Sequence, residues 1–259
     1  MRILIIGHGV VGKNLEKELK ALDPDVIDKY KPEENYIDLE ELQKNGGVYD
    51  IAFICVDTPR TEESDCDITE VFNAIIENEA KIYVIKSTVL PGSTETLRKD
   101  TGKRVIFSPE YYGGTQHCNN FQFDFTILGG ERHACRTVVQ ILQKVYDGRH
   151  QFRITDSKTA ELVKYMENSF LATKVSFCQE FFFIAERMGV DYEELRELFI
   201  LDPRVNPSHT FVDRMHPYWD SHCLNKDVPA AANLPGSKLL SEIVKFNERT
   251  KKDRTMRFY

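Results

Sequence analysis

Residues 2–12, RILIIGHGVVG, decide the fold that this sequence predicts. The apolar run at 2–6 is typical of a short buried strand, and glycines follow it at once. The next residues, KNLEKELKAL at 13–22, repeat leucine at helical spacing. Strand, glycine turn and helix in direct succession indicate the start of an α/β sheet.

The glycines of this turn form the pattern GxGxxG. Gly7 allows a tight turn, Gly9 lets backbone amides approach a pyrophosphate, and Gly12 lets the helix pack closely on the strand. The positive end of the helix, near Val10 and Val11, is suited to phosphates. Because the pattern follows a strand and opens a helix, it predicts a dinucleotide site rather than an ordinary glycine turn.

Asp28 discriminates between the two nicotinamide dinucleotides. It follows Gly7 by 21 residues, at the end of the second predicted strand. A carboxylate at this place accepts hydrogen bonds from the adenosine ribose and repels a 2′-phosphate. We therefore expect NAD as the cofactor, and no metal. Lys29 and Lys31 leave room for a phosphate as the alternative.

Strands and helices alternate through the first 155 residues. The pattern predicts strands at 26–28, 50–56, 81–87, 104–107 and 125–128, and helices at 68–78, from about 93, and at 133–146. Such alternation predicts an α/β fold with a Rossmann-like, doubly wound parallel sheet. We therefore expect an NAD-binding domain at 1–155.

The sequence changes character at Asp156. The stretch 156–188 contains no proline or glycine, and it predicts one continuous helix that Asp156 or Ser157 caps and Gly189 ends. Shorter helices are predicted near 191–198 and 237–247. The long helix has a wide apolar surface, so we expect a homodimer that forms through it. The second domain, 156–259, is therefore predicted to be all-α.

Composition limits the classes of partner and the compartment. The net charge is −7, which disfavours broad binding to nucleic acid, since phosphate-binding proteins usually have a basic face. The six cysteines form no CxxC pair, which favours a reducing cytoplasm over a secreted disulfide framework. Because no stretch approaches about 18 apolar residues, we expect no membrane span.

Three further segments occur in the order found in one enzyme family. They are FICVDTP at 53–59, KSTVLPGST at 86–94 and FSPEYYGG at 107–114. Together with AELVKYMENSFLATKVSF at 160–177, they resemble the UDP-glucose/GDP-mannose dehydrogenase family, whose members are NAD-dependent nucleotide-sugar 6-dehydrogenases. The resemblance implies a nucleotide-sugar substrate such as UDP-glucose.

The segment SHCLNKDV at 221–228 resembles the catalytic element Ser-Cys-Phe-x-Lys-Asp of this family. The resemblance implies that Cys223 is the nucleophile of a four-electron oxidation, in which a primary alcohol becomes a carboxylate with two NAD. The thiol would trap the aldehyde as a thiohemiacetal, which then becomes a thioester. Glu110, Asp227 and a water would hydrolyse this thioester.

The same resemblance implies roles for residues of all these segments. Those on the nicotinamide side of the cofactor are Val56, Thr58, Ser87 and Thr88, and Lys226 would also bind the cofactor. Those that take part in catalysis are Cys223, Lys164, Asn168, Asp227, Glu110 and Thr88. Those that bind substrate are Glu110, Tyr111, Tyr112, Lys164, Asn168 and Arg204. In particular, Lys164 would stabilise a developing oxyanion and Asn168 would orient the substrate.

The sequence departs from the family pattern in three ways. HPYWDSH at 216–222 replaces the glycine-rich loop before the nucleophile, and Gly114 replaces the second glutamate of the segment at 107–114. The resemblance also ends where the final nucleotide-binding domain of the family would begin, so we expect a short form that lacks this domain. Two alternatives therefore stay open: a two-electron dehydrogenase of the β-hydroxyacid type, and an NAD-binding regulatory protein with impaired catalysis.

Overall fold

The computed structural model describes residues 1–31, 48–62, 66–111 and 123–252. The chain divides into two compact units. The first unit comprises Met1–Thr61 and Cys66–Lys164, and the second is built from Tyr165 onward. Each unit has its own hydrophobic core.

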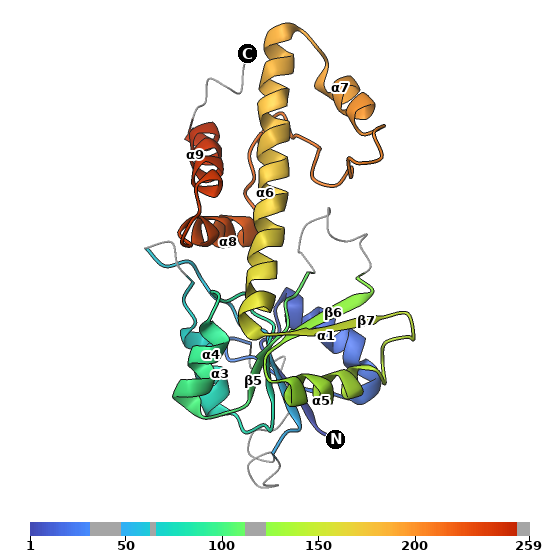
Figure 1. Ribbon diagram of the computed structural model, residues 1–259, viewed down its shortest axis with the longest axis vertical. Coiled ribbons are helices and arrows are strands. Elements are labelled where there is room, and N and C mark those ends of the chain that lie inside the picture. The colour runs from blue at the N-terminus through green and yellow to red at the C-terminus, as the bar shows by residue number, and fades with distance from the viewer. Residues whose placement is uncertain (32–47, 63–65, 112–122, 253–259) are drawn as a thin grey trace. The chain divides into compact units, whose positions relative to one another are not determined.

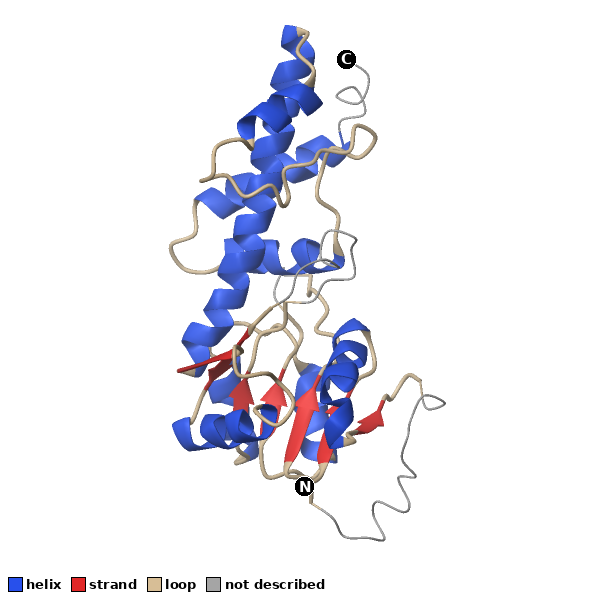
Figure 2. Ribbon diagram, turned by 90° about the vertical axis from the view of Figure 1, so that its right-hand side faces the viewer, coloured by secondary structure: helices blue, strands red, loops and turns tan. Residues whose placement is uncertain are grey.

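The first unit is organised around a sheet. Its strands are β1 (Ile3–Ile6), β2 (Asp25–Ile27), β3 (Ile51–Ile54), β4 (Tyr83–Ile85), β5 (Val105–Phe107), β6 (Phe125–Gly129) and β7 (Gln151–Thr155). Their spatial order is β2-β1-β3-β4-β5-β6-β7. Parallel pairing runs from β2 to β5, with Ile5 opposite Val26 on one side and Phe53 on the other. The arrowheads of these strands therefore point to one edge of the sheet (Figure 2).

Helices cover both faces of this sheet, as Figure 1 shows. They are α1 (Val10–Leu19), α3 (Thr69–Glu77), α4 (Ser93–Thr101) and α5 (Arg132–Leu142). Ile3 and Ile5 of β1 belong to the core under α1 and α5, whereas Leu4 belongs to the core under α3 and α4. Alternate residues of a strand point to opposite faces, so a wholly apolar strand fits two helical layers. The predicted Rossmann-like fold is confirmed.

Two features of the sheet differ from the prediction. β6 pairs antiparallel with β5 through Phe107 and Gly129, so the sheet is mostly rather than wholly parallel. The sequence analysis also missed β7. Gln151 and Arg153 give this edge strand an exposed, polar side, and it therefore lacks the apolar run that signals a buried strand.

The second unit is helical. Its helices are α6 (Ser157–Met188), whose first turns belong to the first unit, and α7 (Tyr192–Phe199), α8 (His222–Ala232) and α9 (Leu239–Lys252). Asp156 caps α6 by accepting a hydrogen bond from the backbone N–H of Thr159 at 2.8 Å, and Gly189 ends the helix with φ +66°. α8 was not predicted because Pro229 lies inside it, where proline is unusual.

In the part of the chain that the structure describes, no helix has the length and apolar character that crossing a membrane requires.

Candidate functional site

The three glycines of the motif that joins β1 to α1 differ in the space around them. Gly7 has φ +93°, and a Cβ there would lie 2.7 Å from the carbonyl oxygen of Cys55. A Cβ on Gly12 would lie 2.0 Å from the carbonyl oxygen of Gly7. A Cβ on Gly9, in contrast, would have no described heavy atom within 4 Å beyond its chain neighbours. The fold therefore requires Gly7 and Gly12, while Gly9 leaves the start of α1 open to a ligand.

A pocket of about 730 Å³ adjoins this turn. Gly7 and Gly9 line it together with the ends of β2 and β3, including Asp28 and Val56, and with one side of α3. In open α/β sheets, ligands bind at the carboxyl ends of parallel strands. The volume suits a small organic ligand such as a nucleoside.

Asp28 is held firmly at the rim of this pocket. Its Oδ2 accepts a hydrogen bond from the backbone N–H of His8 at 2.7 Å, and its Oδ1 accepts one from the backbone N–H of Tyr30 at 2.8 Å. Each oxygen of an ionised carboxylate retains a second lone pair for another donor. These two hydrogen bonds therefore fix the orientation of the Asp28 carboxylate beside the pocket.

The predicted nicotinamide-side residues cross-link the ends of β3 and β4. The Ser87 hydroxyl donates to the carbonyl oxygen of Val56 at 2.6 Å, and the Thr58 hydroxyl donates to that of Thr88 at 2.9 Å. Thr58 and Ser87 are buried, and Thr88 is half-buried. These hydroxyls thus fix the strand ends that shape the cleft.

Glu110, Tyr111 and Lys164 come together in the first unit. Glu110 forms an ion pair with Lys86 at 3.2 Å, and its other oxygen accepts a hydrogen bond from the backbone N–H of Tyr111 at 2.8 Å. The Lys164 ammonium lies 4.9 Å from the centre of the Tyr111 ring, within range of a cation–π contact. Tyr112 and Gly114, which the sequence analysis also named, lie outside the described residues.

A second group of candidates meets between α6 and α8 in the second unit. Asp227 accepts hydrogen bonds from the side-chain amide of Asn168 and from the Lys226 ammonium, both at 2.6 Å. All three side chains are buried. Since an unpaired buried charge is costly, this pairing fixes the positions of the three groups.

Cys223 lies one helical turn before Asp227. It is the second residue of α8, where Ser221 caps the helix by accepting a hydrogen bond from the backbone N–H of Leu224 at 3.2 Å. Cys223 is also the one exposed cysteine among those that the structure describes. A thiol in the first turn of a helix gains thiolate character from the helix dipole.

Three other cysteines have the opposite environment. Burial raises the pKa of the Cys55 thiol to about 12 and that of Cys135 to about 11, and it also raises the pKa of Cys178. These thiols stay protonated near neutral pH, so they are poor nucleophiles.

Arg204 has a different environment from the other candidates. Its guanidinium pairs with Asp202, two residues earlier, at 2.6 Å, and its side chain is 88% exposed.

Two residues near the site were missed as site residues by the sequence analysis. Lys86 pairs with Glu110, and the signal for it was a lysine at the end of an otherwise apolar strand. Glu161 is fully buried, and its two oxygens accept hydrogen bonds from the backbone N–H groups of Gly92 at 2.5 Å and Thr94 at 2.9 Å. Glu161 thus caps the N-terminus of α4 from within α6. Sequence spacing gave no sign of this contact.

The loop that replaces the family's glycines is anchored through Trp219. Its backbone N–H donates to Asn247 Oδ1 at 2.9 Å, and its carbonyl oxygen accepts from Asn247 Nδ2 at 3.0 Å. The indole N–H donates to the Ser176 hydroxyl at 3.0 Å. The loop before Cys223 is therefore held by side chains of α6 and α9.

Across the described ranges, no cluster of three histidine, cysteine, aspartate or glutamate side chains has an arrangement that could hold a metal ion.

Comparison with known proteins matches both parts of the chain to one family. Residues 25–150 match the NAD binding domain of the UDP-glucose/GDP-mannose dehydrogenase family, and residues 158–249 match its central domain. The match to the NAD binding domain confirms the prediction of NAD as the cofactor.

Curated relatives and solved structures agree with this match. The UDP-glucose 6-dehydrogenase of Rickettsia bellii is 30% identical over 228 residues, which cover 81% of this chain and 50% of the relative. The UDP-N-acetyl-D-mannosamine dehydrogenase of Methanocaldococcus jannaschii is 29% identical over 248 residues, 87% of this chain and 56% of the relative. The UDP-D-ManNAc dehydrogenase structure from Pyrococcus horikoshii has a TM-score of 0.77 at 25% identity, and covers 96% of this chain and 69% of that one.

The chain spans about half the length of the curated UDP-glucose 6-dehydrogenases that it matches. It nevertheless aligns with two successive domains, and these matches include the motifs from which the resemblance was inferred. The chain belongs to the UDP-glucose/GDP-mannose dehydrogenase family.

Proposed function

We propose that this protein is an NAD-dependent dehydrogenase that oxidises the primary alcohol of a UDP-glucose-like nucleotide sugar to the uronate, with Cys223 as the nucleophile. The observation that carries the proposal is the arrangement around α8, where an exposed thiol precedes the buried, charge-paired Asp227 by one turn. Family membership supports the substrate class, because relatives are named for oxidising UDP-glucose and UDP-N-acetyl-D-mannosamine.

We assign NAD binding to residues 1–155. Open space around Gly9, where α1 begins with Val10 and Val11, suits a pyrophosphate, and Asp28 suits the adenosine ribose. The nicotinamide side is assigned to Val56, Thr58, Ser87 and Thr88, and Lys226 is also assigned to cofactor binding. NAD, when bound, accepts one hydride in each of two successive oxidations.

The residues of the chain handle the substrate in each step. In the first oxidation, the alcohol carbon loses a hydride and the hydroxyl loses a proton, while Lys164 stabilises the charge that develops on the oxygen. Asn168, one turn further along α6, orients the substrate. Thr88 is assigned to catalysis, beside the carbon that is oxidised. The Cys223 sulfur then bonds to the aldehyde carbon, and the resulting thiohemiacetal loses a second hydride to become a thioester.

Hydrolysis completes the reaction. Glu110, held by Lys86, and Asp227 orient a water, which adds to the thioester carbon as its proton is removed. The carbon–sulfur bond breaks, the carboxylate leaves, and the Cys223 thiolate is restored. One water and two NAD are consumed for each alcohol. Tyr111, Tyr112 and Arg204 are assigned to substrate binding.

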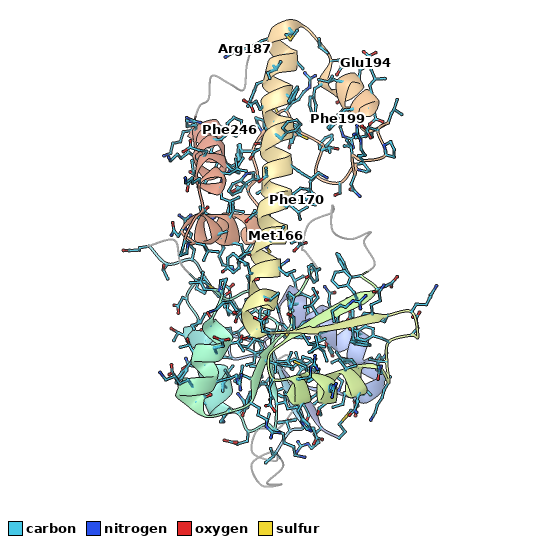
Figure 3. All side chains as sticks on the ribbon, in the orientation of Figure 1. Met166, Phe170, Arg187, Glu194, Phe199 and Phe246 are labelled. Carbon is cyan, nitrogen blue, oxygen red and sulfur yellow. The ribbon has the colours of Figure 1, made fainter. Side chains whose placement is uncertain are left out.

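The second part of the proposal concerns assembly and location. We assign residues 156–259 to dimerisation and to the catalytic cysteine. Exposed apolar side chains recur along α6 at helical spacing, and Figure 3 shows Met166 and Phe170 one turn apart. The set is Leu162, Met166, Phe170, Phe177, Phe181, Ile184 and Met188. We propose that the chain forms a homodimer through these side chains. A monomer mass in light scattering would contradict this assignment. A reducing cytoplasm suits the exposed thiol.

The test is a screen of UDP- and GDP-sugars that counts NADH per sugar consumed. Two NADH per sugar are expected, whereas one would indicate the two-electron reaction and none the regulatory alternative. Cys223→Ser should still bind NAD but lower uronate formation by about a thousandfold or more, because no thioester forms. His222→Asn, at the adjacent exposed position, is the matched control and should still yield uronate. Undiminished uronate from Cys223→Ser would rule out this nucleophile.

A further inference from the structure

The NAD pocket contains two lysines that a preference for NAD over NADP does not explain. Lys29 is the next residue after Asp28, Lys31 lies three residues after it, and both line the same pocket. An ammonium beside the adenosine ribose would attract the 2′-phosphate of NADP, which carries up to two negative charges. Selection of NAD therefore requires that something restrain these two cations.

Contacts of both lysines suggest how this is achieved. The Lys29 ammonium lies 3.4 Å from each carboxylate oxygen of Glu70, the second residue of α3. The Lys31 ammonium lies 3.4 Å from the carbonyl oxygen of His8 in the glycine turn. The hydrogen bond to Glu70 is the main cause of the raised pKa of Lys29, so the lysine is fully charged near neutral pH. The Glu70 carboxylate therefore offsets the positive charge of Lys29 without removing it.

The charges that line the pocket also favour NAD over NADP. Asp28, Asp57, Glu70 and Glu77 supply four carboxylates to its lining, against the two lysines. The Glu70 side chain is 30% exposed and that of Lys29 is 58% exposed, so the pair lies at the rim where a ligand and water both reach it. An exposed ion pair of this kind contributes little to folding stability. Its effect on ligand binding in the pocket is therefore the property to test.

We propose that Glu70 is a second coenzyme-selectivity residue, which acts by holding Lys29 away from the position of a 2′-phosphate. Asp28 rejects the phosphate from the end of β2, and Glu70 removes the cation that would otherwise compensate for this repulsion. The inference rests on the proposed function for its pocket, and it adds α3 as an element that determines which dinucleotide binds.

The test measures the dissociation constants of NAD and NADP by displacement of NADH fluorescence from the whole chain. In Glu70→Gln, the ratio of the NADP constant to the NAD constant should fall about tenfold, since Lys29 becomes available to the phosphate. Glu77→Gln is the matched control, because it removes the same charge from the same pocket. There the ratio should change by about twofold or less.

Removing the cation tests the proposed route. In a Lys29→Met background, Glu70→Gln should lose most of its effect on the ratio. The proposal is overturned if the ratio is unchanged in Glu70→Gln, if Glu77→Gln changes it equally, or if the effect persists in full without Lys29. Failure of the wild-type chain to bind NADH would instead refute the assigned NAD pocket itself, and the inference with it.

Discussion

Two loops that lead into helices are built in opposite ways. The turn before α1 depends on missing side chains, since Gly7 and Gly12 have no space for a Cβ. The loop before α8 depends on bulky ones, since Trp219 is buried and is bonded to Asn247 and Ser176. Each loop ends at the N-terminus of a helix, where the first amides favour negative charge.

The difference lies in where the information for each loop is encoded. A glycine turn is specified by neighbouring residues, because only glycine fits its backbone. The loop at 216–222 is specified by partners far away in the sequence: Asn247 lies 28 residues from Trp219, and Ser176 lies 43 residues from it. A loop that is held in place before a helix therefore does not require glycine, provided that distant side chains hold its backbone.

The largest expected effect comes from adding one methyl group to the glycine turn. Gly12→Ala should destabilise the chain by about 3 kcal/mol or more, because its Cβ would lie 2.0 Å from the Gly7 carbonyl oxygen and the backbone must shift. Gly9→Ala is the matched variant and should change stability by less than about 1 kcal/mol, since space surrounds that position. Urea unfolding curves compare the two. Equal losses would mean that close packing is not what distinguishes these glycines.

A smaller effect is expected when the second loop loses its anchor. Asn247→Ala should cost about 2–3 kcal/mol, because the backbone N–H and carbonyl of buried Trp219 lose their partners. Asn247→Asp keeps the acceptor for the Trp219 N–H but turns a carboxylate oxygen toward the Trp219 carbonyl oxygen in a buried site, so it should cost at least as much as the alanine variant.

The control for this prediction is Gln140→Ala, at an exposed position of α5, which should change stability by less than about 0.5 kcal/mol. The measurement is again urea unfolding, now combined with the rate of Cys223 alkylation. If Asn247→Ala matches the control in both, the loop holds its position without Asn247.

Most of the fold was predictable because its signals are local. β1, the glycine turn and α1 follow from adjacent residues, and α6 follows from its cap at Asp156 and its stop at Gly189. The errors have an equally physical origin. β7 is a polar edge strand, α8 contains Pro229, and the antiparallel pairing of β6 with β5 depends on chain topology rather than on periodicity.

For the candidate site, the sequence named residues but not the contacts between them. The resemblance named Asn168, Lys226 and Asp227, and the buried network that joins them emerged only from the structure. Lys86 was missed because a lysine at a strand end also suits a solvated position. Pairing across α6 and α8, or between β4 and Glu110, joins residues that no short sequence window contains.

The smallest expected effect concerns a third loop, which combines both devices. Gly92 has φ +101°, as a glycine turn requires, and Glu161 of α6 also caps the same helix start from 67 residues away. Burial raises the pKa of the Glu161 carboxyl above its ordinary value of 4.5, against the opposing effect of the two amide donors. The folded chain therefore binds this proton more tightly than the unfolded chain.

The sign of the pH effect follows from this difference. The stabilising contribution of Glu161 protonation is complete below pH 4.5 and is lost as the pH rises through the raised pKa. Glu161→Gln cannot ionise, so the stability of wild type relative to this variant should fall over that window. Urea unfolding between pH 4 and about pH 7 measures the difference. A relative stability that rises with pH would mean that the amide donors of Gly92 and Thr94 outweigh burial, and that this loop depends on an ionised cap.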